Sequence, residues 1–261
     1  MSFVDLAKRH LIYIIIMLCV AVIGTFGIIF KPLPPDPLGL SSTYVMLLGL
    51  SMVAVLLLWG ISAYLFYRWF ATERKSFATL IWALSFFIYG ILFVAMCFQA
   101  LGMPWANMND PVLFFAFREV MIWFLALQWL GIAMQLTENM YIRWIPALLI
   151  LIFGYIWFAF GLLIVADIEY TMYGFTYGIL IPVAFTLAYS FFLYARSAKI
   201  NAPYFLAVGF TGLAICYGAW APWHPVLFYF IWFFLFEASL IPIAIGFPLL
   251  SRDVELRKHR S

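Results

Sequence analysis

Charged residues are scarce in this sequence. Only 10% of its 261 residues are Asp, Glu, Lys or Arg, whereas 67% are hydrophobic. A water-soluble domain is about half apolar and about a quarter charged, so this composition excludes a soluble globular protein. Apolar runs of about 20 residues recur along the whole chain, which is the length that a membrane-spanning helix needs. The sequence therefore predicts an all-α integral membrane protein embedded in a lipid bilayer.

Histidine and lysine are absent from the interior of these apolar runs. The three histidines, His10, His224 and His259, lie at the ends of runs or in the C-terminal tail. Bis-histidine haem and histidine-ligated copper inside the bilayer are therefore argued against. Without a lysine in a run, a retinal Schiff base is excluded too. We expect no cofactor.

Recognisable catalytic motifs are also missing. The chain contains no HExxH, no GxSxG and no glycine-rich phosphate loop, so an enzyme is not the favoured interpretation. Cys19, Cys97 and Cys216 are isolated within apolar runs and are expected to be small buried hydrophobic residues. The net charge of +3 comes with basic residues clustered beside the runs, which does not indicate a nucleic-acid partner.

Eight apolar spans are predicted, connected by short segments within a single polytopic domain, residues 1–261. The first span follows a basic start and is interpreted as a retained helix or signal anchor. The spans cover residues 11–30, 43–67, 77–101, 112–136, 143–166, 171–195, 203–221 and 225–250.

The connections between the spans alternate in charge. Every second connection, together with both termini, contains lysine or arginine, whereas the remaining connections contain Lys31 as their only lysine or arginine. Cytoplasmic loops of membrane proteins are enriched in basic residues. The sequence therefore predicts a multi-pass protein of the cell membrane with both termini in the cytoplasm.

Two pairs of similar segments suggest an internal duplication. MPWANMNDPVLFF (103–115) and APWHPVLFY (221–229) introduce the fourth and eighth spans, and both read PW followed by PVLF. AY, aromatic residues and a basic loop likewise precede the third and seventh spans. These matches suggest parallel repeats, residues 1–136 and 137–261, related by an axis along the membrane normal. Alternatively, spans two to eight form a seven-helix bundle with an additional N-terminal helix.

Three charged residues lie inside the predicted spans: Arg118 and Glu119 in the fourth, and Glu237 in the eighth. A charge at mid-bilayer costs roughly 2.5–3.5 kcal/mol on insertion scales, so such residues should face a partner or water. At 1.5 Å per residue, Glu237 lies about 18 Å along its helix and Arg118 about 10 Å along its own. We expect Arg118 to pair with Glu237, which leaves Glu119 protonated or paired with a ligand or cation.

Two prolines lie inside the predicted spans near polar groups. Pro182 deprives the carbonyl of Gly178 of its helical donor, and Pro242 does the same for Ala238 beside Glu237. These positions are expected to bend their helices, and the freed carbonyls suit cation or proton binding. A plain kink, with the carbonyl satisfied by Ser239 or water, is the alternative.

Two functions are consistent with these features. The first is a small membrane transporter or an ion- or proton-conducting subunit, with Glu237 as the titrating or cation-binding carboxylate and Arg118 as its counter-charge or as an anion clamp. The second is a non-catalytic receptor-like or scaffold subunit of a larger membrane complex, which binds a quinone, lipid or pigment among its aromatic residues. Its partners are then other membrane subunits or further copies of the chain.

Overall fold

The computed structural model describes residues 42–72, 76–101, 103, 111–218 and 226–258, and these residues form helices without any strand. The helices are α2 (Ser42–Ala71), α3 (Phe77–Ala100), α4 (Pro111–Leu136), α5 (Met140–Phe160), α6 (Ile168–Phe175), α7 (Ile181–Ala198), α8 (Ala202–Gly218) and α9 (Val226–Lys258). Two π-helical turns, η2 (Gly161–Val165) and η3 (Thr176–Leu180), continue α5 and connect α6 to α7.

Six helical segments in the described part of the chain are long and apolar enough to cross a membrane. They are Val45–Ala71, Phe77–Ala100, Arg118–Leu136, Met140–Val165, Tyr170–Ala198 and Ile231–Arg252. The predicted all-α membrane protein is therefore confirmed at this level. Helix α8 lies at the seventh predicted position but has 17 residues, which is about 25 Å. The predicted span 11–30 lies outside the described residues.

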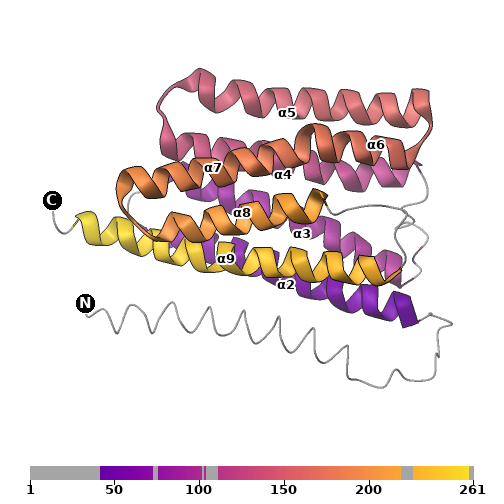
Figure 1. Ribbon diagram of the computed structural model, residues 1–261, viewed down its shortest axis with the longest axis horizontal. Coiled ribbons are helices and arrows are strands. Elements are labelled where there is room, and N and C mark those ends of the chain that lie inside the picture. Colours follow the sequence, from indigo (N-terminus) through magenta and orange to yellow (C-terminus); the bar gives the residue numbers. More distant parts are fainter. Residues whose placement is uncertain (1–41, 73–75, 102, 104–110, 219–225, 259–261) are drawn as a thin grey trace.

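Six of the helices close into a ring. Consecutive helices pack from α2 to α3 to α4, then α4 contacts α7, and α7, α8 and α9 follow until α9 returns to α2. Helix α5 packs on α4 and α6 from outside this ring, and in Figure 1 it forms one edge of the bundle. It is the least covered of the six long segments, since only 22% of its most apolar stretch is buried inside the protein.

Aromatic side chains fill the interior of the ring. Trp82, Phe86, Phe191 and Phe210 are fully buried and contact one another, with Phe191 and Phe210 stacked at 5.6 Å between ring centroids. Offset and edge-to-face contacts of this kind favour aromatic pairs beyond the area that they bury. These four rings therefore form a packed aromatic core in the middle of the bundle.

Most basic residues of the described part gather at one end of this bundle, whereas Arg118 is buried. Arg68 lies in the last turn of α2, Arg143 near the start of α5, Arg196 in the last turn of α7, and Lys199 directly after it. In Figure 1 the connections between α4 and α5 and between α7 and α8 lie at the same end as the C-terminal end of α9. The basic connections, which alternate with non-basic ones along the sequence, thus lie at the same end of the bundle.

Candidate functional site

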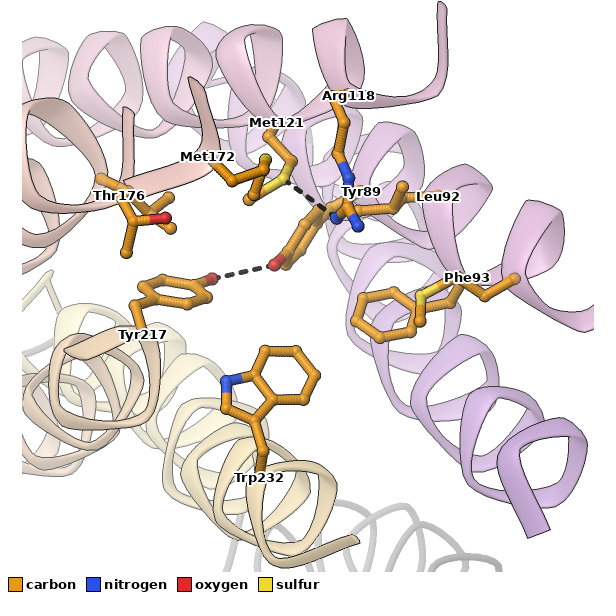
Figure 2. A pocket seen from close by; sticks show the side chains of 11 residues that line it. Tyr89, Leu92, Phe93, Arg118, Met121, Met172, Thr176, Tyr217 and Trp232 are labelled. Carbon is orange, nitrogen blue, oxygen red and sulfur yellow. Dashed lines mark hydrogen bonds between the residues drawn. The ribbon is translucent and has the colours of Figure 1, made fainter. Parts of the chain in front are cut away.

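Arg118 belongs to α4, one of the six helices of the ring, and turns its side chain into the bundle. It is 9% exposed and lines a small cavity with residues of α3, α6, η3, α8 and α9 (Figure 2). Its Nη1 lies 3.6 Å from the sulfur of Met121, one turn along α4. The cavity has a volume of about 20 Å³, which is enough to hold a water molecule.

Two tyrosine hydroxyls meet at the same cavity. Tyr217 of α8 donates a hydrogen bond of 3.1 Å to the hydroxyl of Tyr89 on α3, and both residues line the cavity (Figure 2). Tyr217 is the penultimate residue of α8, while Tyr89 lies about 16 Å before the end of α3. The short helix α8 therefore ends inside the bundle, at the level of Arg118.

The wall of the cavity is completed by a threonine and by apolar side chains. Thr176 is almost fully buried and belongs to η3. The remaining lining residues are Leu92, Phe93, Met96, Met121, Met172, Leu180 and Trp232. We name Arg118, Tyr89, Tyr217 and Thr176 the polar centre. It combines a permanent cation with three hydroxyls around a space for water, so it can hold water or a small anion and can pass a proton between hydroxyls.

Aromatic packing holds the polar centre in place. The Tyr89 ring stacks on Phe124 with 4.0 Å between ring centroids and contacts Phe236 edge-on at 5.8 Å. Phe236 stacks on Trp232 at 5.3 Å, and Trp232 itself lines the cavity. The Tyr89 ring, which carries the hydroxyl, is thus packed against rings of α4 and α9.

Glu119 lies on a different side of α4 from its neighbour Arg118. It is half-buried, and its Oε2 accepts a hydrogen bond of 3.2 Å from the hydroxyl of Tyr155 on α5. The indole Nε1 of Trp123 donates to the same hydroxyl at 2.9 Å. An indole N–H can only donate, so the direction of this chain is fixed from Trp123 through Tyr155 to Glu119. The partner of Glu119 is therefore the hydroxyl of Tyr155, a residue that the sequence analysis did not identify.

Glu237 is buried in α9, with 5% of its surface exposed. The preceding residue, Phe236, stacks on Phe93 at 4.9 Å, and Phe93 lines the cavity. The burial of Glu237 means that its side chain faces the protein and not lipid. The expected pairing of Arg118 with Glu237 stays a prediction.

The two prolines lie in different helical environments. Pro182 is the second residue of α7, which follows η3. The N–H of Ile181 before it donates to the carbonyl of Thr176 in the π-helical pattern. Helix α9 continues through Pro242 without a break in its assignment. Ser239 donates to the carbonyl of Leu235 at 2.6 Å, so this bond does not satisfy the carbonyl of Ala238. The π-helical turn before Pro182 brings Thr176 and Leu180 to the cavity.

A second, much larger depression lies between α5 and the segment formed by α6, η3 and α7. Its volume is about 680 Å³. We name it the α5–α7 groove. It is lined by Leu149, Ile150, Phe153, Ile156, Trp157 and Phe160 on one side and by Gly174, Gly178, Ile179, Pro182 and Val183 on the other. The groove exists because α5 and α7 both pack on α4 and leave a gap between them.

Metal-binding clusters are absent from the described part of the chain, where no three His, Cys, Asp or Glu side chains come together. No protein-family model matches this sequence, and neither a curated protein nor a solved structure matches it.

Proposed function

We propose that this protein conducts protons, or transports a small ion, across the membrane through the polar centre. The observation that carries the proposal is a buried arginine inside a bundle of membrane-length helices, facing a water-sized cavity with tyrosine hydroxyls. Ionisable residues within spans are costly and commonly mark ion and proton pathways.

The size of the cavity favours a proton over a larger substrate. About 20 Å³ beside Arg118 admits a water molecule but not an organic solute. In this proposal Glu237 is the carboxylate that gains and loses the proton, and Arg118 lowers the cost of its ionised form. Tyr89 and Tyr217 relay the proton through their hydrogen bond. Glu119, which Tyr155 holds, is the second acceptor on the same helix as Arg118.

Proton flux into reconstituted liposomes tests this proposal. Wild-type protein is expected to dissipate an imposed pH gradient. Arg118→Met keeps an unbranched chain about as long as the aliphatic part of arginine and removes the charge. We expect it to slow the flux tenfold or more, equivalent to at least about 1.4 kcal/mol of barrier. Tyr217→Phe breaks the hydroxyl relay and should slow the flux severalfold. Tyr189→Phe, on an exposed tyrosine of α7, is the matched control and should leave the flux unchanged. Equal flux in all four proteins, or none above empty liposomes, contradicts the proposal.

We further propose that the protein crosses the plasma membrane eight times. Both of its termini then lie in the cytoplasm. The basic end of the bundle supports this orientation. Its test uses cysteines introduced one at a time at Asn201, at the basic end, and at Asp167, at the opposite end, in a cysteine-free background. An impermeant maleimide should label only the Asp167→Cys variant in intact cells, and the opposite labelling rejects the orientation. The parallel duplication of residues 1–136 and 137–261 is part of the same proposal.

The second candidate function is a receptor-like or scaffold subunit that binds an apolar ligand, with other membrane subunits or further copies of the chain as partners. The α5–α7 groove is the observation that favours it, because its volume of about 680 Å³ falls in the range of small-molecule sites.

A further inference from the structure

Hydrogen-bond donors dominate the chemistry of the polar centre. Arg118 carries a guanidinium group, which is always protonated in proteins and can only donate. Its Nη1 lies 3.6 Å from the sulfur of Met121, and a thioether is only a weak acceptor. The planar fork presents several N–H groups, so even a carboxylate that binds it in the bidentate mode leaves donors for another ligand. The guanidinium can therefore serve the cavity together with a carboxylate partner such as Glu237.

Two hydroxyls add to these donors. Tyr89 accepts the hydrogen bond of 3.1 Å from Tyr217, and because a hydroxyl can accept and donate together, this bond leaves the hydrogen of Tyr89 for a different partner. Thr176 is 2% exposed, and Figure 2 shows its oxygen turned toward the place where the two tyrosine hydroxyls meet. A guanidinium and the hydroxyls of Tyr89 and Thr176 thus border one cavity.

Negative charge is missing from the wall. Among the described residues that line this cavity there is no carboxylate, and outside the polar centre they are aliphatic, aromatic and methionine side chains. The wall is therefore positively charged, which disfavours a cation. A water molecule fits, but it needs acceptors for its own hydrogens as well as donors. An anion accepts from every donor and also compensates the buried charge of the guanidinium.

The volume of the cavity limits the anion to a small one. About 20 Å³ is room for a particle of the size of water. Chloride is only slightly larger than a water molecule, whereas sulfate, phosphate and organic carboxylates contain several non-hydrogen atoms. A monatomic halide is the class of anion that fits both the volume and the charge of the cavity.

We propose that the polar centre binds a monatomic anion of the chloride class, held by the guanidinium of Arg118 and by the hydroxyls of Tyr89 and Thr176. Bound there, the anion takes the space that is otherwise open to water. The inference rests on the proposed function in using the same cavity, and it names a second ion that this cavity holds. Binding is measured at equilibrium, without a gradient, so its failure can be told apart from a failure of proton conduction.

Calorimetric titration of the full chain in detergent micelles tests the site. Sodium chloride is added in a gluconate buffer of constant ionic strength, and the heats give the dissociation constant and the stoichiometry. We expect a single saturable site per chain. Sodium bromide should compete for this site, whereas gluconate should not, because it is too large for the cavity.

Variants locate the bound anion. Thr176→Val and Tyr89→Phe keep the shape of the side chain and remove the hydroxyl, and each should weaken chloride binding about tenfold or more, the factor that a hydrogen bond to a charged group provides. Arg118→Met should abolish binding, and the two hydroxyl variants keep the test valid if this variant does not fold. Thr186→Val makes the same change on an exposed threonine of α7. It is the matched control and should leave the affinity unchanged.

Two outcomes would overturn the inference. The first is the absence of saturable heat when chloride is added to folded wild-type protein. The second is chloride binding that Thr176→Val and Tyr89→Phe both leave unchanged, which would place the anion elsewhere, such as at the basic end of the bundle. A protein that conducts protons but binds no chloride rejects the anion site alone. A protein that binds chloride in the polar centre but conducts no protons supports the anion site and rejects the proposed proton conduction.

Discussion

Arg118 and Glu119 are adjacent in the sequence and serve different parts of the molecule. The helix directs Arg118 toward the cavity between α3, α4 and α8, and directs Glu119 toward Tyr155 on α5. Successive residues on a helix point about 100° apart, so one charged pair supplies both an internal cation and a carboxylate at the α4–α5 contact.

A double-mutant cycle measures the second of these roles. Tyr155→Phe removes both the donor to Glu119 and the acceptor of Trp123, and Glu119→Gln removes the charge. We expect each to lower the free energy of unfolding in detergent micelles, with a coupling energy of about 0.6–1.7 kcal/mol, as for other hydrogen bonds between membrane helices. Tyr189→Phe should cost nothing. Strictly additive losses would show that the Tyr155–Glu119 bond does not stabilise the α4–α5 contact.

Sequence reasoning identified the charged residues but not their surroundings. Arg118, Glu119 and Glu237 stand out because charges inside apolar runs are rare. Tyr89, Tyr155 and Tyr217 do not stand out, because the chain has 15 tyrosines and most are expected at membrane interfaces. Only the packing of α3, α5 and α8 against α4 and α9 shows which tyrosines face another polar group.

At the scale of the helices, close contact between α8 and α9 contrasts with the open groove beside α5. A Cβ on Gly209 would lie 2.8 Å from the backbone oxygen of Ser239 and would also clash with Ile243. Small residues at such positions let membrane helices approach closely. Gly178, in η3, faces empty space. The helices themselves were predictable from hydropathy, whereas the π-helical turns were not, because they depend on which carbonyl each N–H reaches.

Matched glycine substitutions test this contrast. Gly209→Ala must displace α9 or Ile243, and we expect it to lower the free energy of unfolding by about 1–3 kcal/mol. Gly178→Ala meets no neighbour and should leave stability unchanged or raise it by up to about 1 kcal/mol, because alanine favours helix over glycine. Unfolding titrations of the two variants give the comparison. Equal losses at both positions would contradict the described packing of α8 on α9.

At the scale of the whole molecule, six helices form a closed ring with an aromatic core, and α5 is attached outside it. The positions of the spans and the gathering of basic residues at one end follow from the sequence, because both depend on local composition. The peripheral position of α5 does not, since its segment is the most apolar of the six membrane-length segments although it is the least buried. Apolar residues face lipid and protein alike, so composition cannot separate the two.

Proton conduction through the polar centre is tested most directly by one experiment. It measures the protonation of carboxyl groups and the proton flux in the same preparation. Infrared spectra of wild type and Glu237→Gln in liposomes are recorded across pH while proton flux is measured in the same preparation. The proposal predicts a protonated-carboxyl band that titrates in the wild type, and loss of both band and flux in the variant. A carboxylate that stays ionised throughout, with no flux in either protein and impaired folding in the variant, would instead make Glu237 a structural residue.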